Sequence, residues 1–362
     1  MKAPRVLFYA VDGLGLGHVT RLLAIARQVK CLSPDAEIVF LTSSEAEDVI
    51  YREGFVAFKV PSKTLRIEGG IRPATYARMV QGVTLNLLAA FHPHLLVVDT
   101  FPAGAIMELL PVLRWESRKV FIYRVQRAEV AQSPFFQNTL ALYDLAIVPH
   151  QPKSVAIYTP EGVKAEWVGP IIIRSREEAL PKAEARRQLG LPEGEPVIYV
   201  SFGGGGDEEV QSSIEAVSAA MDEKSGPMLA IASPPLYRGA VIPSSRRVPV
   251  YAYPVAKYYT AFDAAITSAG YNTAMELLHF GLPAAFLAFP RTVDDQQARA
   301  AAIEAAGAGI YLKEFAPAAI QQAVSRLLDP QAAGEMAQKG MAMAPENGAR
   351  RAAEAVLGLL PD

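Results

Sequence analysis

The sequence has little cysteine and no long apolar run. Its single cysteine, Cys31, cannot form an internal disulfide, and no thiol-based metal cluster can be built around it. No apolar run is long enough to cross a bilayer, and residues 1–4 lead straight into a strand-like run, so no signal peptide is predicted. We therefore expect no metal site and a cytoplasmic protein, with at most a peripheral contact on the inner face of the membrane.

A strong charge of either sign is also absent. The 35 Lys and Arg residues nearly balance the 37 Asp and Glu residues, which gives a formal net charge of −2. This balance argues against nucleic acid as the main partner. The 51% hydrophobic and 20% charged residues indicate a globular protein, and 362 residues are too many for one ordinary core. The sequence therefore predicts two domains.

The first half alternates between strand-like apolar runs and helical patterns. Strands are predicted at 6–10, 37–41, 95–98, 120–123 and 145–148, and helices at 19–29, 45–53 and 76–91. This alternation predicts an α/β fold with a doubly wound parallel sheet. The third helix is expected to bury Met79, Val83, Leu87 and Leu88, and residues 61–73 are expected to form a polar loop.

A second series of the same design begins at the strand predicted for 196–202, which leads into the glycines 203–206. We therefore expect an N-terminal Rossmann-like domain over residues 1–168 and a linker over 169–181. A second Rossmann-like domain follows over 182–345, and a final helical segment over 346–362.

The most informative stretch is 267–297, which begins after a strand-like run. Gly270 lets the backbone approach a bound group closely, and Asn272 is expected to cap a short helix that ends at Phe280. A helix that opens after a glycine turn favours an anion such as phosphate. Asn272 and Thr273 add side-chain donors, and the carboxylate of Glu276 suits a ribose diol.

A second loop brings polar side chains to the end of the neighbouring strand. Asp294 is expected to begin the next helix, and Asp295, Gln296 and Gln297 can bracket sugar hydroxyls. Sites for phosphate, ribose and sugar that follow one another along the chain indicate a nucleotide-sugar. Each part also has a purely structural interpretation: Asn272 as a cap, Asp294 with Gln297 as a capping box, and Glu276 as a solvated residue.

These residues carry a resemblance to a known family. Ser268–Ala269–Gly270–Tyr271–Asn272–Thr273 with Glu276, Pro290 and Asp295–Gln296 resembles the donor-binding signature of the UDP-glycosyltransferase superfamily. It is also similar to the bacterial family that adds N-acetylglucosamine to the lipid intermediate of peptidoglycan. The resemblance implies the GT-B fold, two Rossmann-like domains facing a cleft, with inversion at the anomeric carbon and no required metal. It also implies that the last helix crosses back to the N-terminal domain.

The N-terminal glycine loop, residues 13–17, is followed by His18. The dinucleotide pattern G-x-G-x-x-G places His18 or Thr20 where its third glycine should stand, and the second strand ends without an acid, so NAD binding is disfavoured. His18 at a helix N-terminus is a candidate general base, or alternatively a structural residue of the loop. The resemblance favours the base, and Gly17 is expected to contact the donor. Asp99 either orients His18 or caps a helix after residues 101–102.

The second glycine loop resembles the V-S-F-G-S run of the family. Gly203 and Gly204 are expected to bring backbone N–H groups to the diphosphate or the sugar. Ala252 lies where the family binds the base, between two tyrosines that can stack on the base or belong to the core. The expected co-substrate is thus a nucleotide-sugar, UDP-linked by resemblance, and no other cofactor is expected.

The resulting hypothesis is an inverting, metal-independent hexosyltransferase with a small-molecule or lipid-linked hydroxyl acceptor. Loops 61–78 and 124–136 contain arginines that would suit an anionic or membrane-bound acceptor: Arg66, Arg72, Arg78, Arg124 and Arg127. The peptidoglycan family carries an acid where this chain has Arg124–Arg127. One alternative is a nucleotide-sugar 2-epimerase, although His279, expected in packing, is the only histidine of the C-terminal half. Another is a non-catalytic sugar-nucleotide-binding protein.

Overall fold

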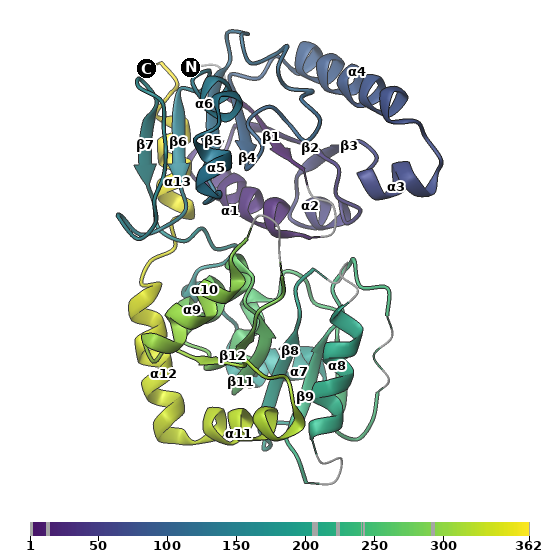
Figure 1. Ribbon diagram of the computed structural model, residues 1–362, viewed down its shortest axis with the longest axis vertical. Coiled ribbons are helices and arrows are strands. Elements are labelled where there is room, and N and C mark those ends of the chain that lie inside the picture. Colours follow the sequence, from purple (N-terminus) through teal and green to yellow (C-terminus); the bar gives the residue numbers. More distant parts are fainter. Residues whose placement is uncertain are drawn as a thin grey trace. The chain divides into compact units, whose positions relative to one another are not determined.

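The computed structural model describes residues 3–11, 15–204, 209–221, 225–239, 241, 243–290 and 294–361. The chain forms two compact units (Figure 1). Unit 1 comprises Met1–Ile173 and Gly348–Asp362, and unit 2 comprises Arg174–Asn347. The expected linker 169–181 is therefore divided between the two units after Ile173.

Unit 1 is built on one parallel sheet with the strand order β3-β2-β1-β4-β5-β6-β7. The strands are β1 (Arg5–Ala10), β2 (Glu37–Thr42), β3 (Val56–Lys59), β4 (Leu95–Asp99), β5 (Arg118–Ile122), β6 (Leu145–Val148) and β7 (Lys164–Trp167). The order reverses between β1 and β4, which is the topological switch point of a doubly wound sheet. The predicted doubly wound sheet is thus confirmed in this half.

The helices of unit 1 pack on this sheet (Figure 1), and all but the last of them lie between its strands in the sequence. They are α1 (Gly17–Leu32), α2 (Asp48–Arg52), α3 (Lys63–Glu68), α4 (Pro73–Phe91), α5 (Ala128–Ala131), α6 (Pro134–Leu140) and α13 (Ala349–Leu357). Helix α13 packs against α1, far away in the sequence. Just before this helix, the Gly348 amide donates a hydrogen bond to the Pro170 carbonyl at 2.7 Å, which fixes the start of α13 against unit 1.

Two predictions for residues 61–91 are wrong. The expected polar loop contains α3, whose first turn is capped by the Ser62 side chain. Helix α4 buries Val80 and Thr84 with Leu87 and Leu88, whereas Met79 and Val83 are 48% and 41% exposed. Positions 79 and 83 have the same four-residue spacing as 80 and 84, so the apolar pattern alone selected the neighbouring face.

Unit 2 repeats the design with the parallel order β10-β9-β8-β11-β12-β13. The strands are β8 (Val197–Ser201), β9 (Met228–Ala232), β10 (Arg247–Val250), β11 (Ala264–Ser268), β12 (Ala284–Leu287) and β13 (Ile310–Tyr311). The helices are α7 (Lys182–Leu189), α8 (Glu209–Ala220), α9 (Tyr271–Phe280), α10 (Gln296–Ala305), α11 (Pro317–Leu328) and α12 (Pro330–Met343), with short 3₁₀ turns η1 (Arg176–Glu178) and η2 (Ala256–Ala261). Here the switch point lies between β8 and β11.

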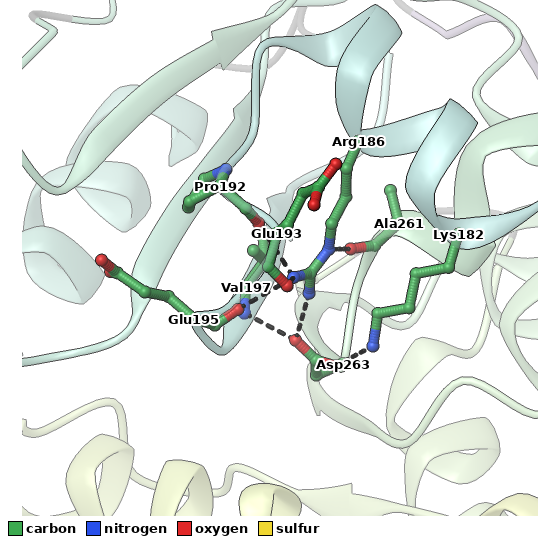
Figure 2. A network of polar contacts seen from close by, with 8 residues as sticks. All are labelled: Lys182, Arg186, Pro192, Glu193, Glu195, Val197, Ala261 and Asp263. Carbon is green, nitrogen blue, oxygen red and sulfur yellow. Dashed lines mark hydrogen bonds and ion pairs between the residues drawn. The ribbon is translucent and has the colours of Figure 1, made fainter.

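The amino ends of β8 and β11 are joined by a buried arginine. Arg186 of α7 donates to the carbonyls of Pro192, Glu193, Glu195 and Ala261 and to the Asp263 carboxylate, as Figure 2 shows. Asp263 also accepts from the Val197 amide at 2.8 Å and from Lys182 at 2.6 Å. This network stabilises the edge of the sheet opposite to the carboxyl ends of the strands.

Candidate active site

The carboxyl ends of β8 and β11 bring two predicted donor-binding turns together in unit 2. Gly203 follows β8 with φ +92°, a conformation that side chains rarely adopt, and a Cβ built there would lie 3.8 Å from Ser268 Oγ. Ser268 is the buried last residue of β11. Gly204 is described and half-buried, whereas Gly205 and Gly206 of the predicted loop lie outside the described residues. Both turns therefore stand at the switch point, where ligands of open α/β sheets bind.

Helix α9 begins directly after the second turn. Its N-cap is Gly270, with extended backbone angles of φ −60° and ψ 143°, so Asn272 is the second helical residue and the predicted Asn272 cap is wrong. Glycine has no side chain that could cover the first amides of the helix. Asn272 and Thr273 are half-buried in this first turn. The helix end therefore combines amide donors with the positive end of the dipole.

Glu276 lies one turn further along α9 and is buried, so its interpretation as a solvated residue is wrong. Tyr259 of η2 donates its hydroxyl to Glu276 Oε2 at 2.8 Å. Burial raises the pKa of Glu276 to about 7, although the Tyr259 hydrogen bond and the charge of Arg174 act in the opposite direction. Tyr259 cannot be identified from the sequence, because it and Glu276 are neighbours only in the folded chain.

The second loop differs from its prediction in how its helix begins. Asp295 is the N-cap of α10 and accepts from the Ala298 amide at 2.9 Å, so the predicted start at Asp294 and its capping box are wrong. Gln296 is buried and accepts from the Phe289 amide at 3.0 Å, whereas Gln297 is exposed. Residues 291–293 of the expected loop lie outside the described part of the chain.

Arg299, which is not recognisable as a site residue from the sequence, joins the two loops. Its guanidinium contacts the Asp294 carboxylate at 2.6 Å and donates to the Ala269 carbonyl at 2.6 Å. It therefore holds the start of α10 against the turn before α9. The predicted base position, Ala252, follows β10 and is half-buried; Tyr251 beside it is 69% exposed, so a core role for Tyr251 is wrong.

The predicted histidine of unit 1 lies at its own switch point. Helix α1 begins at Gly17, so His18 is the second helical residue, and its Nδ1 is 3.4 Å from Asp99 Oδ2. Arg21 makes the shorter contact to the same oxygen, at 2.7 Å, and Thr100 donates to Oδ1 at 2.8 Å. The segment after Asp99 forms turns, so the alternative role of Asp99 as a helix cap is wrong.

Asp99 is completely buried beside these groups. Burial by itself would raise its pKa, but the charges of Arg21 and His18 and the hydrogen bond from Thr100 lower the pKa to about 2. A carboxylate that faces Nδ1 favours the tautomer with the proton on Nδ1, which leaves Nε2 as the basic nitrogen. Phe101 stacks on the imidazole, with ring centroids 5.9 Å apart. The arrangement can therefore remove a proton from a hydroxyl held at Nε2.

Three further observations concern His279, metal binding and membrane-spanning helices. His279 is buried, as predicted, and its Nδ1 lies 2.9 Å from the Ala344 carbonyl, where burial lowers its pKa. Within the described part of the chain, no group of three or more His, Cys, Asp or Glu residues could hold a metal ion. In the same part, no helix has the length and apolar composition needed to span a membrane.

Comparisons with known proteins bear on the fold and on the class of enzyme. Residues 245–356 match the glycosyltransferase family 28 C-terminal domain. The chain is 26% identical to the UDP-N-acetylglucosamine--N-acetylmuramyl-(pentapeptide) pyrophosphoryl-undecaprenol N-acetylglucosamine transferase of Desulforudis audaxviator, over 95% of both chains. Among solved structures it is similar to the spinosyn rhamnosyltransferase complexed with thymidine diphosphate (TM-score 0.67, 17% identity, covering 98% of this chain and 99% of that chain). It is also similar to Acinetobacter baumannii MurG (TM-score 0.59, 16% identity, covering 98% and 100%).

Proposed function

We propose that this chain, a GT-B glycosyltransferase of the UDP-glycosyltransferase superfamily that moves a sugar from a nucleotide-sugar to an acceptor, uses a UDP-linked donor and a hydroxyl acceptor and inverts the anomeric carbon. The observation that carries the proposal is the pair of turns at the switch point of unit 2. Gly203 after β8 and Gly270 after β11 lie beside Ser268, at the start of α9. UDP is supported by the name of the Desulforudis relative, which specifies UDP-N-acetylglucosamine.

The donor would be held by its diphosphate. Backbone amides at Gly203 and Gly204, together with Ser268, would contact the phosphates, as would the first turn of α9 with Gly270, Asn272 and Thr273. Fixed amide dipoles and a helix N-terminus favour the negative charge that develops on the leaving diphosphate. This stabilisation requires no metal ion, which supports a metal-independent reaction.

The other donor contacts follow from their positions on the same edge. Glu276 would accept hydrogen bonds from the ribose diol, and the backbone of Ala252 would contact the base. Asp295 and Gln296 each use one side-chain oxygen within the protein, on the Ala298 and Phe289 amides. Their remaining polar atoms and the exposed Gln297 would bind the sugar hydroxyls.

The reaction itself is a single displacement. Nε2 of His18 takes the proton of the acceptor hydroxyl while the acceptor oxygen forms a bond to the anomeric carbon. The bond from that carbon to the diphosphate breaks, and UDP leaves with the bonding electrons. Attack on the face opposite the leaving group inverts the anomeric configuration. Asp99 would orient His18 through Nδ1, and Arg21 balances the charge of Asp99.

The surface of α3 supports a peripheral contact with an anionic membrane. Leu65 and Ile67 are 36% and 66% exposed, and Lys63 and Arg66 lie on the same short helix. Apolar side chains that insert at the interface and cations that face anionic lipid are the two components of such binding. This contact would place the protein on the cytoplasmic face of a membrane, where a lipid-linked acceptor is one candidate.

The experiment that tests the function is an assay with UDP-, TDP- and GDP-linked sugars, with and without EDTA. We expect UDP-sugars to raise the melting temperature most. UDP release should depend on an alcohol acceptor, EDTA should not reduce it, and an α-linked donor should give a β-linked product by NMR. A product with retained configuration, or a strict requirement for a divalent metal, would contradict the proposal. Formation of an epimer without acceptor would instead indicate an epimerase.

A further inference from the structure

A cavity of about 250 Å³ opens beside His18 within unit 1. It lies at the carboxyl ends of β1 and β2, and α3, α4 and the segment after β4 contribute its other walls. Drug-sized ligands occupy pockets of roughly 300–1,000 Å³, so this cavity has room for about one or two rings. A lipid-linked saccharide would have to leave most of its atoms outside.

The walls of the cavity are mainly apolar. Val11, Val60, Val80, Phe101 and Ala105 supply this apolar surface, and Ser43 and Tyr76 add hydroxyl groups. Apolar walls favour a ligand body that gains by leaving water, such as an aromatic or alicyclic ring, over a phosphate or an oligosaccharide. Lys63, whose ammonium group donates to the Ala105 carbonyl at 3.3 Å, is an exposed residue that also lines the cavity.

One wall carries a buried carboxylate that the reaction described above does not use. Glu108 is only 3% exposed; its Oε1 accepts from the Tyr9 hydroxyl and its Oε2 from the Ile106 amide at 2.8 Å. Both donors are neutral, since burial raises the pKa of Tyr9 well above its ordinary value. In the part of the chain that the structure describes, no lysine, arginine or histidine forms an ion pair with Glu108.

The loop after β4 is shaped around this carboxylate. Gly104 has φ +86°, and a Cβ built there would lie 2.4 Å from Glu108 Oε2. The Ala105 amide donates to the Tyr9 hydroxyl at 3.3 Å, so the loop also holds the donor of Glu108 in place. A buried carboxylate without a counter-charge is unfavourable unless further donors reach it. An ionised carboxylate only accepts hydrogen bonds, so a ligand group that pairs with Glu108 has to be a donor.

We propose that this cavity binds the acceptor, and that the acceptor is an apolar one- or two-ring compound with two donor groups: the reacting hydroxyl at His18 and a second hydroxyl or amine that donates to Glu108. The inference rests on the proposed transferase function and specifies its acceptor. Sites built to bond a ligand hydroxyl discriminate strongly against analogues that lack it, because the buried protein group is then left without its partner.

The test compares a naphthalene diol with its monomethyl ether as acceptors, using the UDP-sugar that the donor screen selects. For the wild-type protein we expect the acceptor KM for the diol to be about 10- to 100-fold lower than for the ether. Glu108→Gln should raise the KM for the diol to that of the ether and leave the KM for the UDP-sugar unchanged. Glu116→Gln, which changes an exposed acid of the same unit, is the matched control.

Equal KM values of the wild-type protein for diol and ether would overturn the inference, and so would a folded Glu108→Gln protein that keeps the preference. The wild-type comparison decides the question even if Glu108→Gln does not fold. Transfer to a lipid-linked saccharide that the diol fails to inhibit would also overturn it and leave the proposed function standing. Absence of UDP-sugar binding, seen as an unchanged melting temperature, would instead refute the proposed function.

Discussion

At the scale of single residues, the most consequential group is the carboxyl of Glu276. Its pKa is raised to about 7 by burial, from an ordinary value of 4.5. Between these two values the folded protein holds a proton that the unfolded chain has released. The free protein should therefore lose stability as the pH rises through this range. The ionised carboxylate, however, accepts hydrogen bonds from a ribose diol better than the protonated form does. The affinity for the nucleotide-sugar should therefore increase as the pH rises.

The first prediction concerns UDP affinity as a function of pH. We expect the affinity of the wild-type protein to increase as the pH rises towards and through about 7, by up to about tenfold per pH unit below the pKa. Glu276→Gln should remove this component, because its amide does not titrate. Isothermal titration calorimetry from acidic to alkaline buffers measures it. The phosphate of UDP titrates equally with both proteins, so only their difference reports on Glu276. Parallel curves for the two proteins would contradict the assignment.

The second prediction concerns His18. His18→Ala should lower kcat by about 10²- to 10⁴-fold, the range for loss of a general base, and leave the Kd for UDP unchanged. Steady-state UDP release and calorimetry together separate the two effects. A variant that transfers sugar at the wild-type rate would show that His18 only supports the glycine loop.

Sequence reasoning can propose candidate site residues whose positions depend on local order, but it misses residues whose contacts depend on partners far away in the chain. Gly203 and His18 each follow a strand predicted from its apolar run, and Ser268 is the last residue of β11, so their place at a sheet edge could be foreseen. Tyr259, Arg299 and Arg21 act through contacts across the fold, with Glu276, with the Ala269 carbonyl and with Asp99. Nothing in the sequence around them specifies those partners.

At the scale of elements, unit 2 carries the buried Arg186 network at one edge of its sheet and the proposed nucleotide site at the other. The Arg186 network joins α7 to the amino ends of β8 and β11 (Figure 2), whereas the glycine turns lie at their carboxyl ends. Removing one partner of a buried charged network leaves groups without compensation. Such a change should lower the stability of the fold and leave the proposed nucleotide site intact.

The third prediction follows from this separation. Arg186→Met should lower the free energy of unfolding by about 3 kcal/mol, because Asp263 and several carbonyls lose a buried donor. Urea unfolding measures the loss, and the Kd for UDP at low temperature should remain that of the wild type. Arg187→Met is the control, since the side chain of Arg187 is 73% exposed and pairs with Glu184 at the surface. A similar loss in both variants would show that the network contributes nothing specific.

The fourth prediction concerns α3 as a membrane-binding element. Ile67→Glu should reduce binding to vesicles with anionic lipid by about tenfold, because it removes an apolar anchor and adds a repelled charge. Co-sedimentation at constant ionic strength measures this. Val130→Glu on α5 is the control, since Val130 is a comparably exposed apolar residue, at 44%, on another helix. Equal binding of both variants and the wild type would exclude α3 as the contact.

The elements themselves show what a pattern can and cannot predict. The central strands β1, β4 and β6 are nearly continuous apolar runs buried on both faces, and they were predicted to within one residue at each end. The edge strands β3 and β7 are mostly exposed or half-buried and lack such runs, so they were missed. For α4, the pairs Met79 with Val83 and Val80 with Thr84 have the same four-residue spacing. Only packing against the rest of unit 1 decides which pair is buried.

At the scale of the whole molecule, the GT-B fold predicted from the resemblance is confirmed by solved structures that cover nearly the full chain. Each unit has one switch point, and each switch point carries one part of the proposed chemistry. Unit 1 places His18 beside the cavity proposed for the acceptor, and unit 2 places two glycine turns at a helix N-terminus. Because a nucleotide at this site would bind only the folded protein, it should raise the melting temperature by mass action.

The most direct test of the account is a crystal structure of the protein with UDP. We predict that the diphosphate lies against the Gly203 turn and the first turn of α9, with the ribose hydroxyls at Glu276. Density for UDP at another place, or an empty carboxyl edge of unit 2 at saturating UDP, would contradict the account.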